Sequence, residues 1–231
     1  RLIQGDVGCG KTIVAILVSS LTVGNNRQVA VMAPTEILAR QHYASFKNEF
    51  DKANIPCCLL VGKMKKTERA TILKGLKEGK ISVVIGTHAL IQEDVEFDSL
   101  GLVIIDEQHR FGVNQRLKLQ EKGDNPHLMS MTATPIPRTL SITYHGDMDL
   151  SIIDELPKNR VPVTTKVVDQ IKIEKVYDFI KSKIALGRQA IIVYPLVKES
   201  EKSDLAAAID AFESLSAIQF SKIKLGLVHG K

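Results

Sequence analysis

The sequence predicts an α/β fold in which a parallel β-sheet carries helices on both faces. Two observations lead to this prediction. Continuous apolar runs of strand length alternate along the chain with segments of helical period, which is typical of strands buried on both faces. Each candidate motif also follows directly after such a run. Because the carboxyl ends of parallel strands meet at one edge of a sheet, we expect the polar residues of these motifs to lie together there.

The individual elements follow from this periodicity. The first predicted strand, over residues 2–4, leads through a glycine-rich loop into an apolar helix that begins at residue 13. A second helix begins near Glu36 and repeats apolar residues at spacings of four, three and four, at Ala39, Tyr43, Phe46 and Phe50. The other predicted strands are the runs over residues 28–33, 57–61, 81–88, 102–109 and 129–135.

The glycine-rich loop is a complete G-x-x-x-x-G-K-T phosphate loop. It consists of Gly5, Asp6, Val7, Gly8, Cys9, Gly10, Lys11 and Thr12. Its glycines let main-chain N–H groups surround phosphates, Lys11 can reach the β- and γ-phosphates, and the Thr12 hydroxyl can bind Mg²⁺. The alternative is a glycine-rich turn with an incidental lysine. The strand before the loop and the helix after it favour the phosphate loop, and thus a nucleoside triphosphate with Mg²⁺ as its ligand.

Two acids end the apolar run that begins at Leu102. Beside a phosphate loop, Asp106 is expected to hold Mg²⁺ from the side opposite Thr12, and Glu107 to orient or deprotonate the attacking water. The alternative is an acidic pair that simply faces solvent. With the phosphate loop upstream, the sequence favours hydrolysis of the nucleotide.

Composition limits the partner and the cellular compartment less tightly than the motifs limit the chemistry. The 231 residues carry a formal net charge of +5, which suits a polyanionic partner but does not demand one. From Lys63 to Lys80, seven basic residues outnumber two acidic ones on a predicted helix; this is a solvated basic face or, less favoured, a phosphate contact. The three cysteines lack metal-ligand spacing and predict reduced thiols and an intracellular compartment. No apolar run has transmembrane length, so no membrane partner is expected.

Taken together, the motifs resemble those of superfamily 2 helicases. The five matching segments, in the order of motifs I, Ia, Ib, II and III, are residues 5–12, 33–42, 84–90, 106–109 and 131–135. Within the superfamily, residues 106–113 and 132–140 resemble the RecG family of branched-DNA helicases and, slightly less well, the Mfd family. Residues 151–157 and 193–201 favour RecG.

The resemblance implies a P-loop NTPase of RecA-like fold over residues 1–156, a linker over 157–162, and a truncated second RecA-like domain over 163–231. In the second domain we expect a helix around residues 173–184, a strand over 189–194, a helix over 199–212 and a strand over 224–229. In such proteins the arginine that completes ATP hydrolysis and the DNA-reading wedge domain lie outside the matching region. The chain by itself is therefore expected to bind ATP and to hydrolyse it negligibly.

The resemblance also suggests roles for single residues. Pro34, Thr35 and Thr87 are expected to contact DNA backbone phosphates, although Thr87 is equally well explained as a strand-end cap. The coupling segment, Thr132, Ala133 and Thr134, is expected to relay the nucleotide state to the DNA path, and the alternative is a turn fixed by the prolines that follow. His109 is expected to bridge motifs II and III as a catalytic residue, and the alternative is a structural histidine.

The function implied by this resemblance is that of an ATP-dependent DNA helicase or translocase of the RecG type. Such a motor uses ATP and Mg²⁺ to remodel branched DNA, including Holliday junctions and stalled forks, in recombination and repair. It is expected to act as a monomer on branched or duplex DNA in the bacterial cytoplasm, at the nucleoid. The alternatives are an Mfd-like translocase on double-stranded DNA and a P-loop switch that binds nucleotide without moving on nucleic acid.

Overall fold

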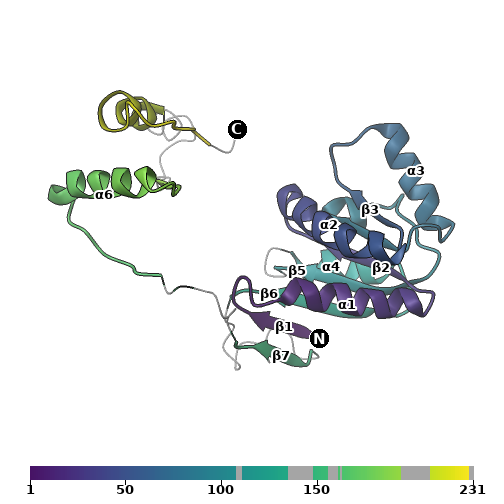
Figure 1. The fold of residues 1–231 in the computed structure, drawn as a ribbon. Helices are drawn as coiled ribbons and strands as arrows, with labels where there is room; N and C mark the ends of the chain where they lie inside the picture. The colour runs from purple at the N-terminus through teal and green to yellow at the C-terminus, as the bar shows by residue number, and fades with distance from the viewer. Residues whose placement is uncertain (108–110, 135–147, 156–160, 162, 194–208, 229–231) are drawn as a thin grey trace. The chain divides into compact units, whose positions relative to one another are not determined.

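The computed structural model describes residues 1–107, 111–134, 148–155, 161, 163–193 and 209–228. It divides the chain into two compact units, Arg1–Val161 and Pro162–Lys231 (Figure 1). Each unit is described by itself below. No helix in the described part of the chain is long and apolar enough to cross a membrane.

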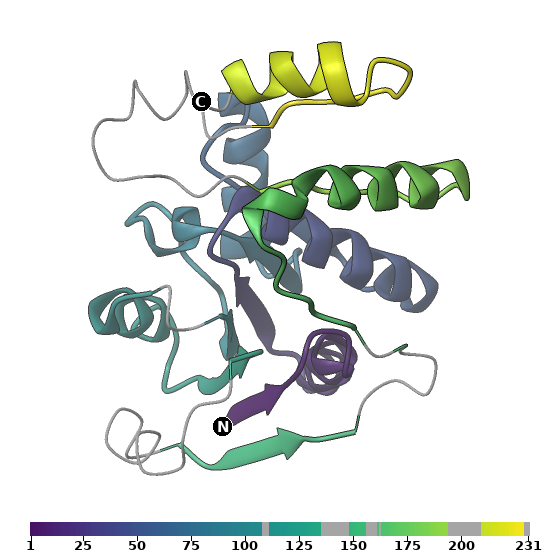
Figure 2. The same ribbon diagram turned by 90° about the vertical axis from the view of Figure 1, so that its left-hand side faces the viewer.

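The first unit is built on one seven-stranded sheet, with strand order β3-β4-β2-β5-β6-β1-β7. All pairings between neighbouring strands are parallel. The strands are β1 (Leu2–Gly5), β2 (Gln28–Met32), β3 (Cys57–Leu60), β4 (Val83–Gly86), β5 (Leu100–Asp106), β6 (His127–Thr132) and β7 (Leu150–Ile153). Figure 2 shows β7 in green beside β1 in purple. The predicted parallel sheet is therefore confirmed, with β7 as a strand that the sequence did not predict.

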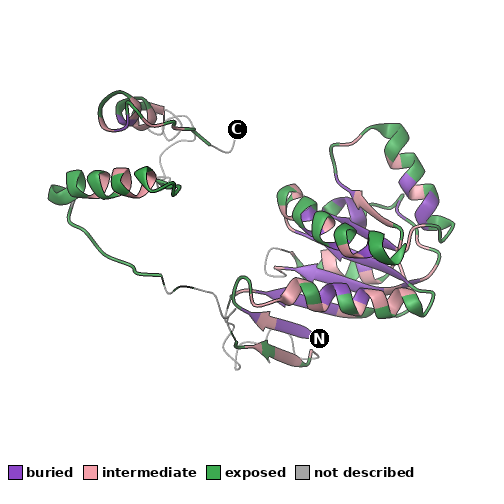
Figure 3. Cartoon of the chain, viewed as in Figure 1, coloured by how far each residue is buried: buried purple, intermediate pink, exposed green. Residues whose placement is uncertain are grey.

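Helices cover both faces of this sheet, as predicted. The helices are α1 (Lys11–Gly24), α2 (Glu36–Phe50), α3 (Lys66–Lys77) and α4 (Val113–Gln120), with short 3-10 turns η1 (Asp51–Ala53) and η2 (His88–Ile91). The central strands β2, β4 and β5, between the helical layers, are buried along nearly their whole length (Figure 3). Strand side chains alternate between the two faces, so each face has its own apolar cluster.

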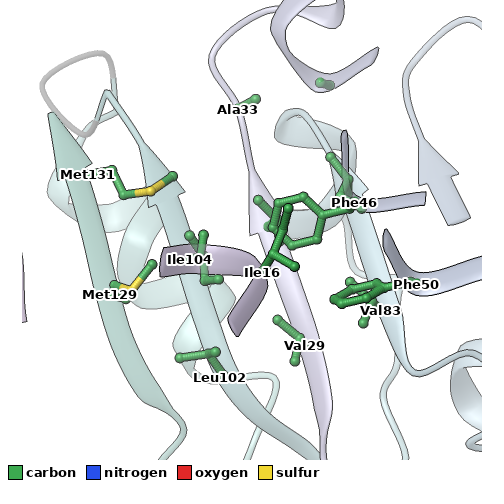
Figure 4. Packing of buried hydrophobic residues seen from close by; sticks show 14 of the residues in the cluster. Ile16, Val29, Ala33, Phe46, Phe50, Val83, Leu102, Ile104, Met129 and Met131 are labelled. Atoms are coloured by element: carbon green, nitrogen blue, oxygen red, sulfur yellow. The ribbon is translucent and has the colours of Figure 1, made fainter. Parts of the chain in front are cut away.

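One cluster lies under α1 and α2. Ile16 of α1 and Phe46 of α2 pack there with Val29 and Ile104 of the central strands (Figure 4). Phe46 is fully buried and meets the ring of Phe50 edge to face, at 5.5 Å between centroids. The cluster on the opposite face receives side chains from α3, η2 and α4, namely Ile72, Leu76, Ala89, Leu90 and Leu119.

The second unit contains η4 (Gln170–Lys172), α6 (Ile173–Ala185), helical residues 209–214 and a π-helical segment, η5 (Leu215–Gln219). Tyr177 of α6 meets Phe220 edge to face at 5.7 Å, and Gln219 donates to the Glu174 carboxylate at 3.0 Å. The helix expected around residues 173–184 is thus present. Of the helix expected over 199–212, residues 199–208 lie outside the described residues.

The two strands predicted in this unit are wrong over the residues that the structure describes. Residues 189–193 and 224–228 carry no strand, and Ile191 is 90% exposed. A parallel strand takes its hydrogen bonds from a neighbouring strand, and neither segment has one within the described part of the unit. An apolar run alone is not sufficient to form a strand.

Candidate nucleotide and strand-binding edge

The predicted motifs lie at the carboxyl ends of adjacent strands. The phosphate loop begins at the last residue of β1, the coupling segment begins at the last residue of β6, and Asp106 ends β5 with Glu107 directly after it. The pairs Gln4 with Thr132 and Met131 with Asp106 show that these three strands reach the same edge of the sheet. On the other side of β5 stand β2 and β4, which lead to Pro34–Thr35 and to Thr87. The edge therefore holds the predicted nucleotide residues on three neighbouring strands and the predicted DNA contacts on the next two.

The phosphate loop takes its shape from two glycines with left-handed backbone. Gly8 has φ +83° and Gly10 has φ +102°, conformations that an L side chain strains to adopt. A Cβ on Gly5 would lie 2.5 Å from the Cys9 sulfur, so the loop also turns back closely on its own start. Gly10 caps α1 without a side-chain hydrogen bond, which leaves the first N–H groups of this helix available for an anion. The loop thus fits a phosphate chain.

Lys11 points its ammonium group into this loop. Its Nζ donates to the carbonyl oxygen of Gly5 at 2.7 Å and to that of Asp6 at 3.0 Å. An ammonium has three donors, so one remains for an oxygen of a ligand even while both bonds persist. The Asp6 carboxylate accepts from the Val7 N–H at 2.6 Å, which supports the turn at the start of the loop.

Asp106 and Glu107 face different partners. Asp106 is 8% exposed, and its Oδ2 lies 2.7 Å from His42 Nε2 of α2. Glu107 has φ +48°, so the backbone turns into the left-handed region directly after the strand. Its N–H donates to the Met131 carbonyl oxygen at 2.9 Å. The turn at Glu107 separates the two carboxylates, so the acids are not equivalent groups facing solvent.

Glu107 contacts the coupling segment. The Thr132 hydroxyl donates to Glu107 Oε2 and the Ala133 N–H donates to Oε1, both at 3.3 Å. Thr132 and Thr134 also share a hydroxyl hydrogen bond of 2.8 Å. The structure therefore joins the second acid directly to the residues expected to relay the nucleotide state. His109, the other residue expected to bridge these motifs, lies outside the described residues.

Thr12 and Asp106 are the residues that could hold a magnesium ion. Thr12 is half-buried in the first turn of α1, and Asp106 ends β5. Among the described residues, no group of three or more His, Cys, Asp or Glu side chains converges to form a metal cage. Mg²⁺ commonly takes one or two protein oxygens and completes its shell with phosphate and water, so a sparse oxygen donor set fits this ion.

The residues predicted to contact DNA differ in how exposed they are. Thr35 is exposed at the N-terminus of α2, where its hydroxyl accepts from the Leu38 N–H at 3.3 Å, and Pro34 is half-buried. Thr87 is only 5% exposed and is the N-cap residue of η2, but its side chain makes no capping hydrogen bond, so the structure does not favour the capping interpretation over a DNA contact. A DNA contact at Thr87 can therefore involve only a small part of the surface of this residue.

His42 is a site residue that the sequence motifs did not single out. It falls three residues after Ala39 and four before Phe46, on the buried stripe of α2. A polar side chain on an otherwise apolar helical stripe was the available signal, because buried polar groups are normally hydrogen-bonded. The sequence could not reveal that its partner is Asp106, 64 residues away.

Comparison with known proteins supports the same interpretation of the motifs. The family model of the DEAD/DEAH box helicases matches residues 1–142. The whole chain aligns with the ATP-dependent DNA helicases RecG of Synechocystis sp. at 48% identity and of Thermotoga maritima at 49% identity, covering 28% and 30% of those proteins. The chain thus spans about a third or less of the length of these relatives.

Solved structures give a consistent result. A RecG bound to a three-way DNA junction matches with a TM-score of 0.77 and 45% identity over 94% of this chain and 28% of that one. The helicase domain of Pyrococcus furiosus Hef matches with a TM-score of 0.56 and 20% identity, which supports the fold alone. The predicted resemblance to RecG-type helicases is confirmed. From the motif order, the parallel sheet and the family match, we conclude that the chain belongs to the DEAD/DEAH box helicase family.

Proposed function

We propose that this chain is the ATPase part of a DNA helicase of the RecG type, which couples ATP hydrolysis to the remodelling of branched DNA. One observation carries the proposal: one sheet edge holds a phosphate loop and two non-equivalent acids next to exposed Thr35 at the start of α2. The similarity to a RecG bound to a three-way junction supports DNA as the partner and a branch as its form.

We propose the following residue roles, which this geometry supports. ATP with Mg²⁺ supplies the phosphoryl group and the charge neutralisation that its transfer needs. Lys11 and the N-terminus of α1 bind the phosphates, and Thr12 and Asp106 provide oxygen ligands for the ion. Glu107 orients or deprotonates the attacking water. Glu107 accepts hydrogen bonds from Thr132 and Ala133, so a movement of its carboxylate changes the hydrogen bonds of the coupling segment.

We also propose the domain division predicted from the sequence, with an ATP-binding RecA-like domain over residues 1–156 and the first part of a second one over 163–231. The division into compact units between Val161 and Pro162 supports a linker over 157–162.

Pro34, Thr35 and, to a smaller extent, Thr87 contact backbone phosphates. His109 completes the link between motifs II and III, and the motor acts as a monomer. The bacterial relatives support a cytoplasmic location, and a position at the nucleoid is part of the proposal.

The test is ATP hydrolysis by the full-length protein with a three-way junction, a linear duplex or single-stranded DNA, together with junction unwinding. The proposal predicts that the junction stimulates hydrolysis and is unwound. Lys11→Ala serves as the inactive control and should lower turnover about ten- to a thousandfold, since it removes a charge-assisted phosphate contact. Stimulation by duplex without junction unwinding would favour an Mfd-like translocase. Nucleotide binding with no DNA stimulation would favour a switch.

A further inference from the structure

His42 contacts Asp106, which belongs to the predicted nucleotide site. It does so from α2, the helix that starts at the predicted DNA contact Pro34–Thr35. Its Nε2 lies 2.7 Å from Asp106 Oδ2, and each of the two side chains is 11% exposed. A carboxylate oxygen accepts, so Nε2 is the ring nitrogen that carries the hydrogen and donates. A buried charge-assisted bond of this length fixes the direction of the Asp106 carboxylate.

The contact leaves Asp106 free to serve a metal. It occupies Oδ2, and no hydrogen bond to Oδ1 is formed by the residues that the structure describes. Carboxylates that bind metals are commonly held by a second group through their other oxygen, and that group tunes the affinity of the ion. An apolar residue would fill the same position on the buried stripe of α2, between Ala39 and Phe46, without holding the carboxylate.

The N-terminus of the same helix is the predicted DNA contact. Thr35 is the N-cap of α2, and the Ala39 N–H donates to its carbonyl oxygen at 2.9 Å. His42 follows Thr35 by seven residues, about two helical turns or roughly 10 Å along the axis. No loop intervenes, so a displacement of the first turn of α2 reaches His42 through continuous helical hydrogen bonds.

The start of α2 and Asp106 are also supported by adjacent strands. β2, which leads into Pro34 and α2, pairs directly with β5, which ends at Asp106, and Met32 lies opposite Ile105. The scaffold under the contact is therefore a single strand pair. In this setting, a change in the position of α2 can alter the His42–Asp106 contact while β2 and β5 remain paired.

We propose that His42 is a positioning residue for Asp106 and that it transmits contact of a DNA strand at Pro34–Thr35 to the magnesium site. The proposal rests on the proposed function, because it assigns DNA to the start of α2 and Mg²⁺ to Asp106. It adds a residue and a route: strand binding shifts α2, and α2 sets the orientation of the Asp106 carboxylate through His42.

The test compares His42→Phe, which fills the space without a donor, with His42→Gln, whose amide N–H can replace Nε2. Tyr43→Phe, one residue along the same helix, is the matched control. Binding of a fluorescent ATP analogue by the full-length protein is titrated with Mg²⁺. We expect His42→Phe to raise the Mg²⁺ concentration at half-saturation about tenfold or more. His42→Gln should restore most of the Mg²⁺ affinity, and Tyr43→Phe should leave it unchanged.

A second readout addresses transmission. DNA should lower the Mg²⁺ concentration at half-saturation in the wild type and in Tyr43→Phe. This decrease should be absent in His42→Phe. Equal half-saturation in His42→Phe and wild type would overturn the positioning role and leave the proposed function intact. A normal DNA-induced shift in His42→Phe would overturn the transmission route. If DNA leaves the Mg²⁺ half-saturation of the wild type unchanged, the transmission route fails. The proposed function is judged separately by junction-stimulated ATP hydrolysis, and the Mg²⁺ titration still decides whether His42 positions Asp106.

Discussion

The Glu107 carboxylate accepts a hydrogen bond from the Thr132 hydroxyl at 3.3 Å, while the neighbouring Asp106 carboxylate is held by His42 on another element. This separation predicts different defects for the two acids. Glu107→Gln retains the shape of the side chain but cannot accept a proton, so ATP should bind normally and be cleaved about 10²–10⁴-fold more slowly. Asp106→Ala should already weaken Mg²⁺-dependent binding. Binding of a fluorescent ATP analogue, with and without Mg²⁺, and single-turnover hydrolysis measure the two steps separately.

Asp154→Asn is a suitable control for charge removal, because Asp154 is an exposed acid just after β7 and should leave both steps unchanged. If Glu107→Gln and Asp106→Ala fail together at the binding step, the division of roles between the acids is wrong.

The three cysteines should differ in reactivity. Burial raises the pKa of the Cys57 and Cys58 thiols to about 12, so at pH 8 both remain protonated and carry on the order of a thousandfold less thiolate than an unperturbed thiol. Cys9 lies in the phosphate loop beside Gly5. We expect a maleimide to modify Cys9 first and ATP with Mg²⁺ to slow that modification. Mass spectrometry over a time course follows each site.

Cys9→Ser is the control for this experiment and should show little early modification. Labelling of Cys9 at the same rate with and without saturating nucleotide would contradict the position of the nucleotide over the loop.

The basic segment around α3 divides into paired and unpaired cations. Four of its members form ion pairs with nearby acids: Arg69, Lys74, Lys77 and Lys80. Three exposed lysines that precede or begin the helix, Lys63, Lys65 and Lys66, have no ion pair within the described part of the chain. They follow β3, next to β4 and on the same sheet edge as Thr87. If the segment contacts DNA, these three carry the contact.

Replacement of Lys63, Lys65 and Lys66 by alanine should therefore weaken DNA binding. The slope of log K against log salt should also fall by about 0.9 for each phosphate that the variant no longer neutralises. Replacement of Lys74, Lys77 and Lys80 is the matched control and should change the slope less. Fluorescence anisotropy over a salt series measures both. Identical slopes for the two triple variants and the wild type would support a basic face that is only solvated.

The core under α2 should be sensitive to truncation. Phe46 is fully buried between α2 and the central strands, so Phe46→Ala should lower the free energy of unfolding by about 3–5 kcal/mol through reduced burial and a cavity. Ile37 lies on the same helix but is 72% exposed, and Ile37→Ala should change stability by less than about 0.5 kcal/mol. Urea unfolding followed by circular dichroism compares them. A similar destabilisation in both variants would contradict the packing of α2 on the sheet.

Sequence patterns located six of the seven strands because each lies in a short segment rich in apolar residues. Their ends were less predictable. The run that begins at Leu102 was expected to continue to residue 109, but the strand ends at Asp106 because Glu107 takes a left-handed conformation. β7 was missed although β1, β3 and β4 are equally short; it is an edge strand and none of its residues is buried, so its pattern gives a weak signal. Local pattern does not report such tertiary effects.

The same limit applies to the site. The phosphate loop and the acids are local motifs, and both stand at the predicted sheet edge. The partners that distinguish the acids come from far along the chain: His42 for Asp106, and Thr132 for Glu107. Residues 189–193 show the opposite error, because an apolar run predicted a strand where no described neighbour pairs with it.

The position of β1 within the sheet has a consequence for how the protein is made. Leu2 pairs with Ser130 of β6 on one side and with Leu150 of β7 on the other, so both neighbours of this strand are synthesised well over a hundred residues later. Pairings of such long sequence separation form slowly. On the ribosome, β2, β4 and β5 can assemble while the segment with Lys11 still has no strand to hold it. Nucleotide can therefore stabilise the nascent chain only after β6 has emerged, and the ATP site is the last part of this sheet to become functional.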